Sequence, residues 1–250
     1  NSQDIQRSPA VALDSILRQI PSFSLFRRTS SLAAHPTSQG VSLRGIGPSG
    51  VSRTLVLLDN FPFNDPFGGW VYWSRVPISS IERIEIVEGP SSNIYGNFAM
   101  GGVIHILTQP PQRRTVAAEA RFGNRETAKL DFFASDVWGP IGLSLDGTMF
   151  HTDGYKIIAP NKRGQVDINA NTEHENFNLK LEYNPSSDFN IFVKGSYFDE
   201  DRSNGTSVQQ NNTQWRFLGG GLRFRTADNS EWQVSLFSHF QNFGSNFSAV

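Results

Sequence analysis

The sequence contains no cysteine, which excludes disulfide frameworks, thiolate metal sites and cysteine nucleophiles. It also lacks an excess of either charge, because 22 Lys and Arg residues nearly balance 23 Asp and Glu residues. Nucleic acid is therefore not an expected partner, since its recognition depends on a surplus of positive charge. No stretch approaches the roughly 18 consecutive apolar residues of a membrane helix. The first residues also lack the basic and apolar regions of a signal peptide.

Motifs for catalysis and metal binding are missing as well. The five histidines are scattered, and no pair of them has metal-ligand spacing. We find no nucleophile elbow, phosphate-binding loop or dinucleotide fingerprint. Asp199-Glu200-Asp201 offers oxygen ligands for Ca²⁺ but lacks the usual ligand spacing with a turn glycine, so a solvated loop is the expected role. The sequence thus predicts no enzyme, no cofactor and no metal site.

The first 110 residues carry mixed helix and strand signals. Ser8-Pro9 is typical of a helix start, and apolar residues from Leu13 to Ile20 recur at the spacing of one helical face. The continuous apolar run Leu55 to Leu58 predicts a strand buried on both sides. Asp59-Asn60 then predicts a turn. These signals predict a small mixed α/β domain over residues 1–110, followed by a proline-stiffened linker at 111–114.

The stretch from Ile78 to Thr108 is the most informative part of this domain. Arg83 to Val87 alternates between apolar and charged residues, and Gly89-Pro90 ends the predicted strand. A second predicted strand, Val103 to Leu107, follows Gly101-Gly102, where the backbone can approach another segment closely.

After the linker, residues 115–250 change to a period of two, which predicts about seven amphipathic strands. The alternating stretches are residues 116–122, 128–134, 141–149, 177–183, 189–197, 218–224 and 232–240. A soluble β-sandwich and an outer-membrane barrel would both show this pattern. Connection lengths favour the barrel, because short turns alternate with long polar links at about 152–173 and 199–213.

Taken in order, Val41-Ser-Leu-Arg-Gly45, Leu55-Val-Leu-Leu-Asp59 and the stretch 78–108 closely resemble the plug domain of TonB-dependent outer-membrane receptors. Plugs of this family fill barrels of about 22 strands. The resemblance implies a small mixed α/β plug domain followed by antiparallel transmembrane β-barrel strands, a partial barrel of the 22-strand type. It also implies a fragment, which lacks the TonB-binding segment at one end and the remaining strands at the other.

The barrel interpretation assigns the two faces of the strands. Charge is rare in a lipid-facing band, so the apolar face is expected to meet lipid and the polar face the lumen. We expect Leu130, Phe132, Leu143, Leu145, Leu179 and Leu181 on the lipid face, and Lys129, Asp131, Ser144, Lys180 and Glu182 on the lumen face.

The resemblance also suggests site residues. Arg44, in Leu-Arg-Gly, matches the plug arginine that pairs with barrel carboxylates, and Arg83 is a second candidate for this plug-to-barrel contact; a solvated surface role is the alternative. Glu88 departs from the family's basic residue before Gly-Pro and would repel barrel glutamates unless a cation such as Arg83 compensates. Asn60 and His105 stand where the family more often has Gly and Asn.

The loop after Asn60 is rich in aromatics and supplies the candidate ligand contacts, because outward-facing plug loops help to form the family's binding surface. Gly68-Gly69 suggests a mobile, exposed turn that projects these side chains. The candidates are Phe67, Trp70, Tyr72 and Trp73. Inward packing of Trp70 and Trp73 is the alternative.

The function that the resemblance implies is active transport across the outer membrane of a Gram-negative-type bacterium, without catalysis. The ligand would be an iron-siderophore, or alternatively cobalamin or another nutrient, and the partners would be the TonB energy-transducing complex and outer-membrane lipid. A soluble, secreted β-sandwich binding protein is the alternative from a different class.

Overall fold

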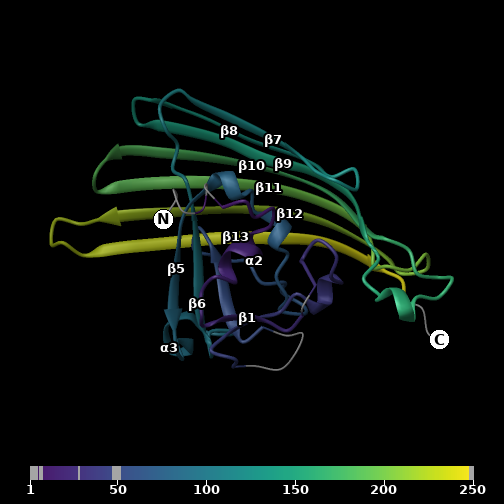
Figure 1. Cartoon of the computed structure of the whole chain (residues 1–250). Coiled ribbons are helices and arrows are strands. Elements are labelled where there is room, and N and C mark those ends of the chain that lie inside the picture. Colours follow the sequence, from purple (N-terminus) through teal and green to yellow (C-terminus); the bar gives the residue numbers. More distant parts are fainter. Residues whose placement is uncertain (1–4, 6–7, 28, 47–51, 248–250) are drawn as a thin grey trace. The chain divides into compact units, whose positions relative to one another are not determined.

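The computed structural model describes residue 5 and residues 8–27, 29–46 and 52–247 (Figure 1). The chain divides into two compact units. One comprises residues 1–108 with 155–164, and the other comprises residues 109–154 with 165–250. Within the described ranges, no helix is both long and apolar enough to cross a membrane.

The first unit is built on a four-stranded mixed sheet in the order β4-β3-β6-β5. Its strands are β3 (Thr54–Leu58), β4 (Phe61–Pro62), β5 (Ile81–Glu88) and β6 (Gly102–Thr108). β3 and β6 run parallel, whereas β4 and β5 pair antiparallel with their neighbours. The strands expected at Leu55–Leu58, Arg83–Val87 and Val103–Leu107 are thus confirmed with slightly wider bounds.

Short elements surround this sheet. They are α2 (Leu13–Leu17), η1 (Pro36–Ser38), η2 (Trp73–Arg75), η3 (Ile78–Ser80), α3 (Ser92–Tyr95) and the two-stranded sheet of β1 (Phe23–Leu25) and β2 (Val41–Leu43). The expected helix start at Ser8 is wrong, because α2 begins at Leu13. The Ser8 hydroxyl instead accepts a hydrogen bond from Ala10 N at 3.3 Å, a local turn that competes with helix.

β3 lies between two apolar layers, as its continuous apolar run predicts. Val56 belongs to the main core, whereas Leu55 and Leu57 pack in a separate cluster with Val103 on the other face. Gly102 shows why the adjacent glycines are needed: its φ is +134°, and a Cβ there would lie 2.3 Å from Val87 O. The close approach expected at Gly101-Gly102 is therefore confirmed.

Two of the unusual residues in this unit are in contact. The backbone N–H of Asn60 donates to His105 Nε2 at 3.2 Å, and this bond requires an unprotonated imidazole nitrogen. Burial lowers the pKa of His105, with Arg83 acting in the same direction and Glu85 and Asp59 opposing it. Folding therefore favours the neutral form of this side chain.

This bond predicts a pH dependence. Because the folded pKa of His105 lies below the unfolded value, its stabilising contribution is complete above about pH 6.5 and is lost as the pH falls toward the folded pKa. We expect the first unit to unfold more easily as the pH drops below about 6.5, and His105→Gln to flatten this dependence. The measurement is amide exchange of β3 and β6 across that range, corrected for intrinsic exchange rates. Identical pH profiles for the two proteins would contradict the assignment.

The second unit is one antiparallel sheet of seven strands in sequential order, from β7 to β13. The strands are β7 (Thr115–Phe122), β8 (Ala128–Trp138), β9 (Ile141–Tyr155), β10 (Ala170–Ser186), β11 (Phe189–Ser203), β12 (Gln210–Arg225) and β13 (Glu231–Ser245). The link between β9 and β10 carries η4 (Pro160–Lys162), which belongs to the first unit. The expected number of strands is confirmed. The alternative of a β-sandwich is not confirmed, because the seven strands form a single open sheet rather than two packed layers.

The two faces of this sheet have opposite polarity, and their exposure is the reverse of that in a water-soluble protein. Lys129, Asp131 and Ser144 are buried on one face. On the other, Leu179 and Leu181 are 49% and 45% exposed. The alternation of faces therefore follows the sequence prediction.

The strands also run further than their apolar residues. β9 continues to Tyr155 and β10 begins at Ala170, so the long link shrinks to residues 156–169; the next link shrinks to 204–209. Polar residues in these extensions keep the period of two, as Thr172, His174 and Asn176 are buried in alternation. The sheet therefore continues beyond its apolar band.

Candidate functional site

The aromatic loop that follows β4 is held by two adjacent polar residues. Asn64 Oδ1 accepts from Val56 N at 2.7 Å, and Asn64 Nδ2 donates to Thr54 O and Gly69 O at 3.2 Å each. Asp65 Oδ1 accepts from Phe67 N at 2.9 Å and Gly68 N at 2.7 Å. These bonds hold the loop on both sides of Gly68-Gly69, where the sequence predicts a mobile turn.

Three of the four aromatic candidates for ligand contact in this loop are buried. Trp70, Tyr72 and Trp73 are 8%, 1% and 1% exposed, so their expected projection from the surface is wrong. Trp73 lies in the main core and meets Phe23 edge to face, with ring centroids 6.0 Å apart. Phe67 alone of the four candidates is exposed, at 94%.

Arg75 is a buried cation beneath this loop that the sequence reasoning missed. Its guanidinium carbon lies 4.4 Å from the centroid of the Phe63 ring, and Nη1 donates to Phe63 O at 3.4 Å. Burial lowers the pKa of Arg75 to about 9, against the opposing influence of Tyr72 and Asp65. The sequence offered one signal for this cation: Asp65 and Arg75 are the charged residues on either side of a largely apolar loop.

The two candidate contact arginines lie at exposed positions of the first unit. Arg44 follows β2 with a φ of +59°, and its amide donates to Ser22 O at 2.8 Å. Arg83 on β5 pairs with Glu82 at 3.1 Å and Glu85 at 2.7 Å. Among the described residues, the ion pairs of Arg83 are with these two carboxylates and not with Glu88, so Arg83 does not compensate the charge of Glu88.

The buried polar face of the seven-stranded sheet carries ion pairs between residues two apart on one strand. Lys129 Nζ lies 2.9 Å from Asp131 Oδ2, with side chains 5% and 3% exposed. Lys180 pairs with Glu182 at 2.8 Å, and Arg202 pairs with Glu200. Asn178 also donates to Asp146 at 2.8 Å across two strands. These six charged side chains are therefore compensated within their own strands.

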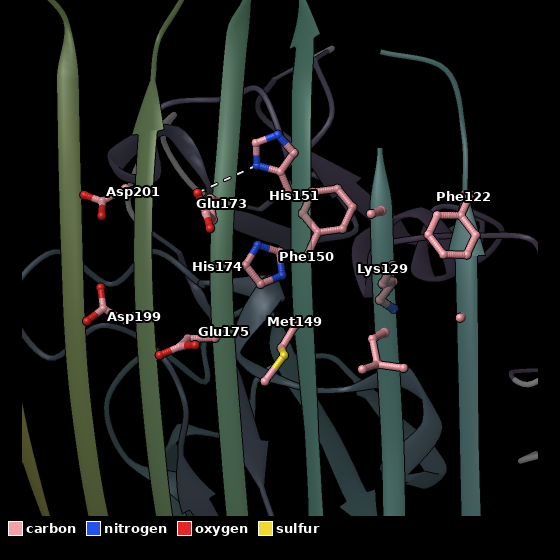
Figure 2. Close-up of a pocket in the computed structure, with 13 residues that line it drawn as sticks. Phe122, Lys129, Met149, Phe150, His151, Glu173, His174, Glu175, Asp199 and Asp201 are labelled. Atoms are coloured by element: carbon pink, nitrogen blue, oxygen red, sulfur yellow. Dashed lines mark ion pairs between the residues drawn. The ribbon is translucent and has the colours of Figure 1, made fainter. Parts of the chain in front are cut away.

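A cavity of about 580 Å³ lies on the second unit. Figure 2 shows His151 and Glu173 directed toward each other from neighbouring strands, with Asp199 and Asp201 beyond Glu173. Glu173 is the cross-strand partner of Asp201, and Glu175 is that of Asp199. The complete lining is Ala120, Phe122, Ala128, Lys129, Leu130, Met149, Phe150, His151, Glu173, His174, Glu175, Asp199 and Asp201.

Comparison with known proteins identifies the first unit. Residues 1–103 match the family model described as the TonB-dependent Receptor Plug Domain. The mixed sheet and its flanking helices lie within or next to this range. These residues therefore form a plug domain of the kind found in TonB-dependent receptors.

Solved structures extend the likeness to the rest of the chain. The ferric enterobactin receptor PfeA matches with a TM-score of 0.70 at 18% identity, over 95% of this chain and 40% of its own. The siderophore receptor PirA from Acinetobacter baumannii matches with a TM-score of 0.70 at 18% identity, over 97% and 39%. The copper transporter OprC matches with a TM-score of 0.75 at 15% identity, over 95% and 36%.

These likenesses show the fold of the second unit. The seven-stranded sheet matches part of the barrel of TonB-dependent receptors, so it is a partial, unclosed barrel wall that follows the plug domain in the sequence. The chain spans about 40% of the length of these two receptor structures.

Sequence reasoning also missed the grouping of His151 and Glu173 in the barrel wall. The two residues are distant in the sequence and meet only through strand pairing. The available signal was His151-Thr152-Asp153, because residues two apart on a strand share a face.

Proposed function

We propose that the chain is part of an outer-membrane active-transport receptor that imports a scarce external ligand, with energy from TonB and without catalysis. The observation that carries this proposal is a plug domain joined to a sheet whose exposed face is apolar and whose buried face is charged. A sheet with this exposure is stable only when its apolar face is covered, and lipid covers it in outer-membrane barrels.

The substrate that we propose is an iron-siderophore complex. Two of the matched structures are named as siderophore receptors, which supports this choice, and the third is named as a copper transporter. Copper and cobalamin are therefore the competing substrates.

Uptake by whole cells tests the function. Cells that carry the full-length receptor should accumulate ferric siderophore, and removing TonB should abolish accumulation while leaving surface binding intact. Accumulation of copper or cobalamin in place of iron would show that the proposed substrate is wrong and that copper or cobalamin is transported instead. Accumulation that does not depend on TonB would contradict the transport mechanism.

The two exposed arginines fit contacts between plug and barrel. We assign Arg44 as the first candidate because its guanidinium is exposed and the described residues supply no ion pair to it. Arg83 is a weaker candidate because Glu82 and Glu85 already engage it. Both assignments follow from the family resemblance and from these positions.

Face assignment leads to a labelling prediction. Single cysteines at Asp131 or Ser144 in the full-length receptor should react with a water-soluble maleimide, whereas cysteines at Leu130, Leu145 or Leu179 should not, because the reactive thiolate does not form in lipid. The residues come from opposite faces of the same strands, so they serve as matched controls. Equal reactivity of the two sets would contradict the membrane assignment.

Phe67 is the ligand contact that we propose in the plug. Its side chain is exposed on a loop that hydrogen bonds hold in place, so truncation should weaken binding without unfolding the plug. Loss of a central aromatic contact typically costs about 2 kcal/mol, a drop of roughly thirtyfold in affinity. Equilibrium binding of ferric siderophore to Phe67→Ala measures this. Unchanged affinity would leave recognition to the barrel loops.

A further inference from the structure

Four residues with metal-binding side chains meet at one end of the second unit, on the side of the long connections. His151 and Asp153 come from β9, Glu173 comes from β10, and Glu126 comes from the turn between β7 and β8. Ligand atoms of Glu126, His151 and Asp153 all lie within 4.8 Å of one another. Strand pairing brings these residues together, and their spacing in the sequence matches no metal-binding motif.

The distances suit a metal ion better than direct hydrogen bonds. His151 Nε2 lies 3.6 Å from Asp153 Oδ1, and His151 Nδ1 lies 3.7 Å from Glu173 Oε2. Both separations exceed the usual range for a hydrogen bond. Two ligands bound to one tetrahedral Zn²⁺ at about 2.1 Å lie roughly 3.4 Å apart. The imidazole and the Asp153 carboxylate are thus spaced as two neighbouring ligands of one ion.

The two ring nitrogens of His151 face different carboxylates. Nε2 is directed toward Asp153, and Nδ1 is directed toward Glu173 on the neighbouring strand. Histidines that bind metals usually present their second ring nitrogen to a carboxylate, which fixes the tautomer and the ring orientation. Glu173 lies on the Nδ1 side of the ring at 3.7 Å, so its carboxylate would have to move closer to His151 to act as this orienting group (Figure 2).

The turn that supplies Glu126 is tied to the same strand. Asp153 N donates to Arg125 O at 2.9 Å, and Gly123 N donates to Thr127 O at 2.9 Å. These bonds place the Glu126 backbone beside Asp153. A side chain in an otherwise exposed turn therefore has a defined partner on β9.

We propose that Glu126, His151 and Asp153 bind one divalent first-row transition metal ion, with Zn²⁺ as the test ion and Glu173 as the positioning residue for His151. The imidazole ligand favours such an ion over Mg²⁺ or Ca²⁺, which prefer oxygen ligands alone. The bound ion ties the β7–β8 turn to β9 and β10. The proposal rests on this local geometry and not on the proposed transport function.

Neighbouring carboxylates in the same cavity provide a contrast. Asp199 Oδ2 accepts from Tyr197 at 2.7 Å and from Gln214 at 3.1 Å. Asp201 is the cross-strand partner of Glu173 but faces no imidazole nitrogen in the ion pairs of the described residues. Asp201 is therefore the matched control for a site that depends on histidine.

Binding of Zn²⁺ to the full-length receptor in detergent tests the proposal by calorimetry. We expect one ion per receptor in the wild-type protein, no measurable binding at this site in His151→Ala or Asp153→Asn, and a tenfold to hundredfold weakening, roughly, in Glu173→Gln. Asp201→Asn should bind as the wild-type protein does. Heat-modifiable gel mobility reports the folding of every variant.

Three results would overturn the site. They are the absence of stoichiometric Zn²⁺ binding, an equal loss in Asp201→Asn, and Ca²⁺ binding as tight as that of Zn²⁺ and unaffected by His151→Ala. The second would indicate diffuse surface acidity, and the third would indicate an oxygen-only site. Two separate ligand variants are included so that misfolding of one does not decide the outcome.

Discussion

Replacing Trp73 with alanine should destabilise the plug by about 3–5 kcal/mol, the usual cost of removing a large aromatic side chain from a core. Trp73 is 1% exposed and meets Phe23 edge to face within the main apolar cluster. Truncation would remove this contact and leave a cavity between β1 and η2. The loss is large compared with the total stability of a small domain.

Amide hydrogen exchange of the plug in the full-length receptor measures this loss. A change of 3–5 kcal/mol corresponds to exchange that is roughly 10²- to 5 × 10³-fold faster in the strands that open only by unfolding. Phe67→Ala is the matched control, because it removes an aromatic side chain from the same loop at an exposed position. Equal protection in the two variants would show that Trp73 does not hold the plug together.

The contrast between Trp73 and Phe67 shows where local sequence reasoning fails. Gly68-Gly69 indicated a mobile turn, and the aromatics after it were expected at the surface. Instead, Asn64 and Asp65 bond to backbone groups on both sides of the turn. Whether an Asn or Asp side chain finds such partners depends on strands distant in the sequence. Glycine content alone therefore could not reveal the burial of Trp73.

The sheet was more predictable, because its faces follow a strict period of two. That period assigns Leu179 and Lys129 to opposite faces without any knowledge of tertiary contacts. Its limits appear where both faces become polar, as in β10 before Phe177, since the pattern of apolar residues no longer marks the strand. Glu126, His151 and Asp153 also lie outside the apolar part of the strands. Their proximity could not be predicted without the register of strand pairing.

The helix start shows a third kind of failure. Ser8-Pro9 carries the local signal for a helix beginning, but α2 begins at Leu13. Asp14 is buried and pairs with Arg27 at 3.0 Å and Ser31 at 2.6 Å. These tertiary contacts place the helix, and they outweigh a capping preference that is typically worth about 1 kcal/mol.

Breaking the Lys129–Asp131 pair from one side should destabilise the barrel wall by about 3–5 kcal/mol, because Lys129→Met leaves a buried carboxylate without its cation. The two side chains are 5% and 3% exposed, and their charged atoms lie 2.9 Å apart. Thr148 Oγ1 still donates to Asp131 in the variant, but a hydroxyl does not replace a full positive charge.

A matched pair on the same face separates burial from charge pairing itself. Lys180 and Glu182 have the same chemistry and spacing, but their side chains are 15% and 14% exposed. Water can partly solvate the carboxylate there, so Lys180→Met should cost only about 1 kcal/mol. Urea unfolding of the full-length receptor in detergent, followed by heat-modifiable gel mobility, gives both values.

The double variant Lys129→Met/Asp131→Leu supplies the remaining test. If the cost of the single change comes from an unpaired buried charge, removing the carboxylate as well should restore most of the lost stability, because both positions are then apolar. The residual deficit should reflect Thr148, which loses its acceptor. A double variant as unstable as Lys129→Met alone would show that packing of the lysine side chain, and not charge compensation, stabilises this face of the sheet.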